Sequence, residues 1–163
     1  MGAGKILILI GALLTLVSTF FLTFATGLSG IGFLFNIPEI ISQGTTFPIW
    51  VLIIGSEMVL YILTIVYIVF ILSGILQLVG LASRVVAIIG SILPIVVGVL
   101  IILISLDVLD YGQYTILFAH TDIVTDIVPL DIPLGDLGSL GAFTLLGGGV
   151  LGLVGGILGT KDY

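Results

Sequence analysis

The sequence has no cysteine and very few charged side chains. Without cysteine the chain forms no disulfide, no zinc-thiolate site and no iron–sulfur cluster held by thiolates. Only 7 % of the 163 residues are charged, against roughly 25 % in a soluble domain, whereas 60 % are hydrophobic. We therefore expect a single integral membrane domain, residues 1–163, with no separate soluble catalytic domain.

Cationic and imidazole groups are scarce as well. Three Lys and Arg residues cannot neutralise a phosphate backbone, which excludes a basic nucleic-acid-binding surface. One histidine and no cysteine leave no evident pair of nucleophile and base, and no histidine pair that could hold haem between helices. We expect a protein that is not an enzyme, with no catalytic residue and no cofactor.

What the chain does contain is apolar runs, each reaching the ~20 residues that a membrane-spanning helix needs. The four predicted spans are residues 6–27, 48–82, 85–106 and 138–159. Lys5 precedes the first span, Arg84 lies between the second and third, and Lys161 follows the fourth. Four crossings place these cations on one side, so the positive-inside rule predicts that both termini are cytoplasmic. The first run is too long for the 7–15-residue core of a cleaved secretory signal, although it begins like one.

The predicted fold is therefore an all-α membrane protein, a bundle of four transmembrane helices with two ordered outer segments. The first outer segment, residues 28–47, is too apolar for a solvated loop. Its apolar side chains would be covered by a short interfacial helix after Pro38, by a segment lying along the membrane surface, or by a protein–protein contact. The second, residues 107–137, is acidic and extended. If residues 48–82 form one helix, it is about 50 Å long, so it projects beyond the bilayer or bends near Gly55 or Gly74.

Two rows of small or hydroxyl residues predict close helix packing. Gly11, Thr15, Thr19 and Thr23 recur at a spacing of four in the first span, and Gly148, Gly152 and Gly156 do so in the fourth. Their partner is a neighbouring helix of the same chain or another copy. Gly147, Gly149 and Gly152 match a dinucleotide-binding pattern, but no strand precedes them, so that function is rejected. Pro94 predicts a kink in the third span, with Gly90 and Ser91 one turn earlier.

Three acidic residues and the histidine are candidates for binding a proton, an ion or a metal. Glu57 is the one acid within a predicted span, and a buried carboxylate there could bind a proton or an ion. An interfacial Glu57 without such a role is the competing interpretation. His120, Asp122 and Asp126 form a weak candidate metal site, because one imidazole and two carboxylates can hold a divalent cation. A solvated acidic surface is the alternative, and overall we expect no metal.

The layout is similar in topology to that of claudins and tetraspanins, but the chain lacks their outer-loop cysteines and no family is assigned. We expect a multi-pass protein of the plasma membrane that acts as a self-associating structural protein or a small scaffold subunit. Its partners would be the lipid bilayer, further copies of itself or other membrane subunits. The alternatives are a channel or transporter subunit that uses Glu57, and a membrane-derived subunit of a filament or viral envelope.

Overall fold

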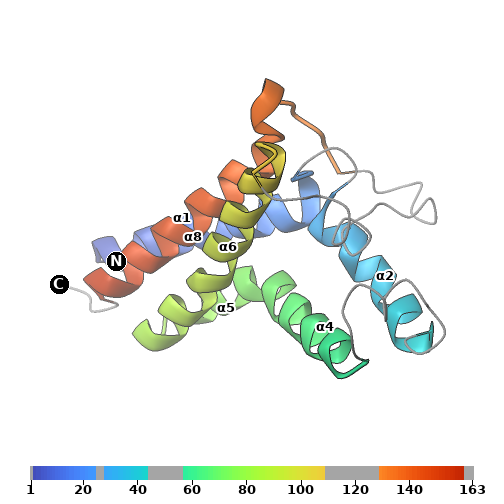
Figure 1. Cartoon of the computed structure of the whole chain (residues 1–163). Coiled ribbons are helices and arrows are strands. Elements are labelled where there is room, and N and C mark those ends of the chain that lie inside the picture. Colours follow the sequence, from blue (N-terminus) through green and yellow to red (C-terminus); the bar gives the residue numbers. More distant parts are fainter. Residues whose placement is uncertain (1, 25–27, 44–56, 109–128, 160–163) are drawn as a thin grey trace.

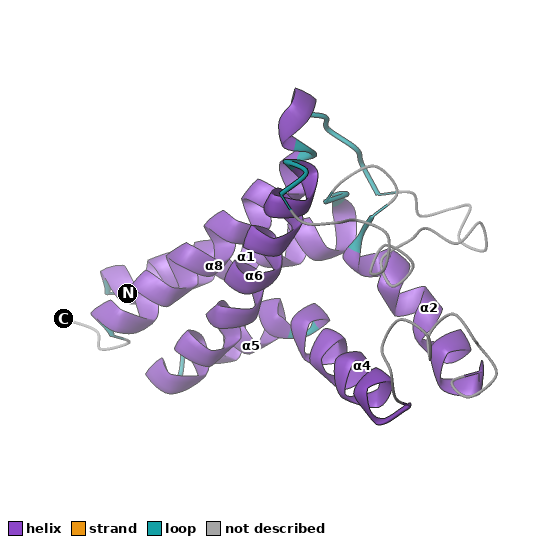
Figure 2. Ribbon diagram, in the orientation of Figure 1, coloured by secondary structure: helices purple, strands orange, loops and turns teal. Residues whose placement is uncertain are grey.

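The computed structural model describes residues 2–24, 28–43, 57–108 and 129–159, and every named element within these residues is a helix (Figures 1 and 2). The all-α prediction is confirmed for this part of the chain. The elements are α1 (Ala3–Phe21), α2 (Gly30–Gln43), α4 (Glu57–Ile71), α5 (Ser73–Val79), α6 (Arg84–Ser105), the 3-10 turn η1 (Gly135–Leu137) and α8 (Leu140–Leu158).

Three of these helices are long and apolar enough to cross a bilayer, namely α1, α6 and α8. Helices α6 and α8 lie close to the predicted spans 85–106 and 138–159. Helix α1 ends at Phe21, six residues before the predicted end of the first span. The chain is extended at Leu22, where the backbone pairs with Leu130: the Leu130 N–H donates to the Phe21 carbonyl at 2.8 Å. This pairing with a distant segment replaces the next helical turn.

Helices α1 and α6 both run antiparallel to α8. Gly4 lies against Gly155 near one end of the α1–α8 pair, and Gly141 lies against the Thr23 carbonyl at the other. In the α6–α8 pair, Gly156 faces Ile88 and Gly138 faces Ser105. Both ends of the chain therefore lie at the same end of the bundle (Figure 1).

The second predicted span is not one straight helix in its described part. Helix α4 ends at Ile71, Leu72 forms a turn, and α5 continues for seven residues in a new direction (Figure 1). Helix α5 forms a tight hairpin with α6, in which Gly80 lies directly against Ala87. The bend lies next to Gly74, one of the two expected positions. Residues 48–56 of that span, including Gly55, lie outside the described part.

Helix α2 corrects the expectation for the first outer segment. It begins at Gly30, eight residues before Pro38, and contains Pro38 within it. The reason lies in Ser29, whose hydroxyl accepts a hydrogen bond from the Gly32 N–H at 2.9 Å and so caps the first turn. Pro38 does not start the helix, because this cap has already satisfied an early amide further upstream.

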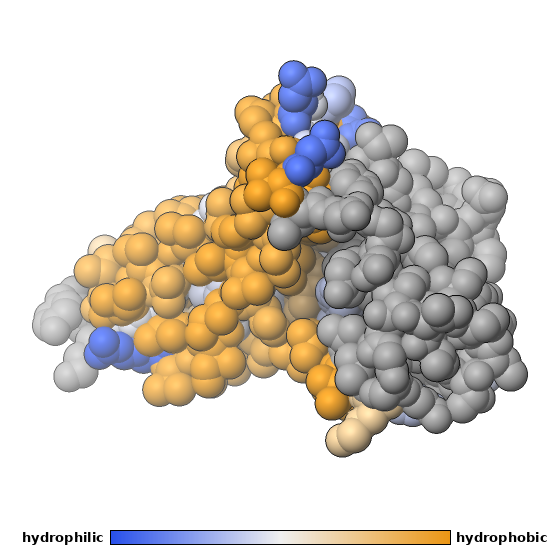
Figure 3. All heavy atoms as spheres, viewed as in Figure 1, coloured by the Kyte–Doolittle hydropathy of each residue, from blue (hydrophilic) through white to orange (hydrophobic). Residues whose placement is uncertain are grey.

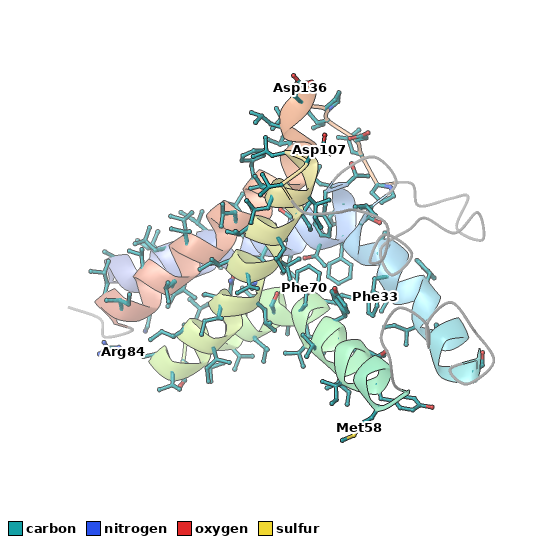
Figure 4. The ribbon with its side chains drawn as sticks, in the orientation of Figure 1. Phe33, Met58, Phe70, Arg84, Asp107 and Asp136 are labelled. Atoms are coloured by element: carbon teal, nitrogen blue, oxygen red, sulfur yellow. The ribbon has the colours of Figure 1, made fainter. Side chains whose placement is uncertain are left out.

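A cluster of apolar side chains lies where α2 and α4 meet the long helices. Phe24, Phe33 and Phe70 are fully buried there. The Phe24 and Phe70 ring centroids are 6.1 Å apart, and those of Phe33 and Tyr67 are 4.8 Å apart. Figure 4 shows Phe33 and Phe70 between α2 and α4 at this junction. The Phe33–Tyr67 pair joins α2 to α4, and the Phe24–Phe70 pair attaches α4 to the segment that follows α1.

Candidate functional site

The α1–α8 contact brings together several of the small residues singled out in the sequence. A Cβ added at Gly11 would lie 2.6 Å from the Gly148 carbonyl oxygen and 2.6 Å from the Gly152 nitrogen. A Cβ at Gly148 would lie 2.6 Å from Thr15 Oγ1. The two backbones therefore approach at a distance that only glycine permits. The partner of the glycine face of α8 is thus α1 of the same chain over this stretch.

The remaining members of the two rows have other neighbours. Gly156 faces Ile88 and Ala87 of α6 rather than α1. The Thr19 hydroxyl donates to the Thr15 carbonyl at 2.8 Å and is buried. Thr23 lies two residues beyond the end of α1, and its hydroxyl donates to Asp131 Oδ1 at 2.9 Å. Thr23 therefore belongs to a loop contact and not to the helix face on which the spacing placed it.

Gln77 of α5 is the central polar residue of the bundle, and its side chain is fully buried. Its Nε2 donates to the Gly90 carbonyl at 3.4 Å, a long hydrogen bond, and its Oε1 accepts from the Thr15 hydroxyl at 3.1 Å. The Gly90 carbonyl lies four residues before Pro94, which has no N–H to offer it. The Gln77 amide thus supplies a donor for the carbonyl that Pro94 leaves free.

Helix α8 leaves room for this polar cluster, which we define as Thr15, Gln77, Gly90 and Ser91. A Cβ added at Gly152 would lie 3.1 Å from Gln77 Nε2, and it would also overlap the Ser91 hydroxyl. Ser91 Oγ donates to the Ala87 carbonyl at 2.6 Å. The cluster therefore joins α1, α5 and α6, with the glycine of α8 closing over it.

The chemistry available to this cluster is hydrogen bonding between neutral groups. Its members are two hydroxyls, one amide and a backbone carbonyl, none of which ionises near neutral pH. A lone amide within an apolar span is the signal that would have found Gln77 in the sequence, because polar groups in lipid require an internal partner. The sequence alone did not indicate that this partner is the carbonyl freed by Pro94.

A second polar contact lies at the other end of the bundle. Asp131 Oδ1 accepts hydrogen bonds from the Thr23 hydroxyl and from the Ser139 hydroxyl, the latter at 2.7 Å. Ser139 directly precedes α8, and Thr23 follows α1. One carboxylate oxygen therefore ties the end of α1 to the start of α8.

The charged side chains that the structure describes lie at opposite ends of the bundle of long helices. Lys5 and Arg84 occupy the first turns of α1 and α6, at the end that carries both termini. Asp107 and Asp136 lie at the far end, as Figure 4 shows for Arg84, Asp107 and Asp136. In Figure 3, hydrophobic residues cover the helices between these ends and hydrophilic residues gather at the ends. This is the polarity that a bilayer-spanning bundle requires.

The remaining candidates fall on parts that the structure does not describe in side-chain detail. Glu57 is the first residue of α4, and its side chain lies outside the described atoms. His120, Asp122 and Asp126 lie outside the described residues, as does Lys161. Within the described ranges, no three His, Cys, Asp or Glu residues gather to form a metal-ligand group.

The chain matches no protein-family model, no curated protein and no solved structure in the three comparisons made. The class that the described fold defines is accordingly broad: a helical protein with apolar helices suited to a membrane.

Proposed function

We propose that this chain is a non-enzymatic integral membrane protein of four spans, which self-associates or serves as a small scaffold subunit of a larger membrane complex. The observation that carries the proposal is the position of α4, which leaves the bundle with a broad apolar face. Met58, Ile62 and Ile65 are 72 %, 49 % and 61 % exposed, and their spacing of four and three places them on one helix face.

Helix α4 packs against α2 and touches α5, whereas α6 packs along both α5 and α8. An apolar helix face that its own chain leaves open can pack against another membrane helix. We infer that the Met58–Ile62–Ile65 face packs against the same face of a second copy. The small-residue faces of α1 and α8 do not mediate self-association over the stretches where they already pack against helices of the same chain.

The path of the chain supports four crossings. Helices α1 and α6 run in the same direction, so the chain must return across the bundle between Phe21 and Arg84. Helix α5 supplies part of that return, because it runs antiparallel to α6 in the hairpin. By the positive-inside rule, Lys5 and Arg84 favour a cytoplasmic position for both termini, and we propose the plasma membrane as the location.

The absence of native cysteine makes cross-linking a clean test of association. Ile65→Cys should form disulfide-linked dimers in native membranes under mild oxidation. The matched control is Ile92→Cys, on the apolar face of α6, which is 48 % exposed and should stay monomeric. A monomeric mass in mild detergent together with no Ile65→Cys dimer would contradict self-association. Co-purification of one other membrane protein would then be required for the scaffold role.

Topology is tested with the same cysteine-free background. An impermeant maleimide should label Asp136→Cys in intact cells, whereas Ser83→Cys in the α5–α6 turn should react only after the membrane is opened. The reverse pattern would place the termini outside.

A further inference from the structure

The bend between α4 and α5 interrupts the helical hydrogen bonds within a predicted membrane span. The Leu72 N–H donates to the Ile68 carbonyl at 3.0 Å, and the ladder resumes where the Leu76 N–H donates to the Leu72 carbonyl at 2.9 Å. Between these two bonds the backbone turns at Leu72, and α5 starts at Ser73. Backbone groups released by a break at membrane depth must find partners other than lipid.

The Ser73 hydroxyl lies at this break. Its residue is fully buried, and its Oγ is the one buried side-chain polar atom without a hydrogen-bond partner among the described residues. Other buried hydroxyls donate to the carbonyl four residues earlier, as Ser91 does to Ala87 at 2.6 Å. For Ser73 that carbonyl belongs to Val69, on the other side of the turn, and the hydroxyl does not bond to it.

We propose that the break binds one water molecule, which accepts a hydrogen bond from Ser73 Oγ and donates to backbone carbonyls that the turn releases. Two observations meet at this place: an interrupted ladder and a buried hydroxyl without a partner. A buried water requires two to four polar partners, and a hydroxyl beside a broken helical turn supplies them. The surroundings are neutral, since the described residues of α5 and the adjoining part of α4 carry no charge, which favours water over an ion.

The bound water would stabilise the bend itself. It replaces the direct hydrogen bonds of a straight helix, so the angle between α4 and α5 persists without leaving polar groups exposed to lipid. The inference is independent of the proposed association, because it concerns contacts within one chain.

Replacing Ser73 with alanine distinguishes a bound water from an isolated hydroxyl, because the unfolding temperature should fall in the first case and stay the same or rise in the second. With water bound, Ser73→Ala should lower the unfolding temperature of the full chain in lipid nanodiscs by about 2–4 °C. Ser73→Thr should recover most of that loss, because it keeps the hydroxyl. Ser91→Ala is the matched control, and it should lower the unfolding temperature by less, because its hydroxyl is bonded within its own helix. An unchanged or raised unfolding temperature for Ser73→Ala would overturn the proposal.

A measurement on the unaltered protein keeps the test independent of variant folding. In solid-state NMR of the protein in bilayers, magnetisation should pass from water to the Gly74 amide. The Gly98 amide, which lies against Leu146 between α6 and α8, should receive none in the same period. Absence of transfer to Gly74 would overturn the proposal, whatever the variants do.

Discussion

The long-helix bundle and the α2–α4 pair are held together in different ways. In the bundle of α1, α5, α6 and α8, glycines let backbones touch, and an amide and hydroxyls bond across the contacts. The α2–α4 pair relies on aromatic rings, such as Phe33 against Tyr67. In lipid, apolar burial gives little preference for one helix contact over another, so close approach and hydrogen bonds determine the packing. We therefore expect glycine substitutions to destabilise the bundle strongly, whereas substitutions in the α2–α4 pair should destabilise only that pair.

The largest effect is expected from glycine substitution in the bundle. Gly148→Ala should lower the free energy of unfolding by about 2–3 kcal/mol, because its Cβ would lie 2.8 Å from the Gly11 carbonyl and the Thr15 nitrogen, and backbone cannot move aside. The control is the adjacent Gly147→Ala, whose Cβ would meet nothing within 4 Å and should be neutral or slightly stabilising. Unfolding by SDS titration in mixed micelles measures both. Equal effects would mean that the α1–α8 contact is not close.

An intermediate effect is expected at the polar cluster. Gln77→Ala should cost about 1–2 kcal/mol, because the Gly90 carbonyl and the Thr15 hydroxyl lose their partner. In the background of Pro94→Ala the same change should cost roughly 0.5–1 kcal/mol less, since an alanine in place of Pro94 would return a backbone N–H to the Gly90 carbonyl. The measurement is a double-mutant cycle by SDS titration. Strict additivity of the two changes would show that Gln77 does not compensate for Pro94.

The smallest effect is expected in the α2–α4 pair. Phe70→Leu keeps an apolar side chain but removes the ring contact with Phe24, at a cost of about 1 kcal/mol. Hydrogen exchange followed by mass spectrometry should show faster exchange in α4, with α1 and α8 unchanged. Faster exchange throughout the molecule would mean that the two regions unfold as one unit, which contradicts the comparison.

Several features of the fold could be predicted from residue patterns, and others could not. Helices α6 and α8 follow from apolar length, because a bilayer sets the number of residues that a span needs. The sequence does not predict the start of α2, because the cap at Ser29 lies far upstream of the more conspicuous Pro38. The turn at Leu72 was expected only as one of several responses to an overlong apolar run. No residue pattern near Leu72 shows which of these responses the chain adopts.

The candidate site divides in the same way. The small-residue rows are visible in the sequence, but spacing cannot say whether their partner is another helix or another chain. Thr23 belongs to the row by spacing, yet Leu130 pairs with the backbone there and ends the helix first. Gln77 is visible in the sequence as a lone amide within an apolar span, but its acceptor is not, because the Gly90 carbonyl becomes available only through Pro94 on a different helix.

Composition and charge placement alone predict a helical membrane class and the side on which the termini lie, because apolar length and cation position act locally on each span. The pairing of α1 with α8, the rescue of the Gly90 carbonyl by Gln77 and the turn before Ser73 arise from contacts between residues far apart in the chain. Such contacts depend on which backbones approach closely, and that is determined when the helices assemble.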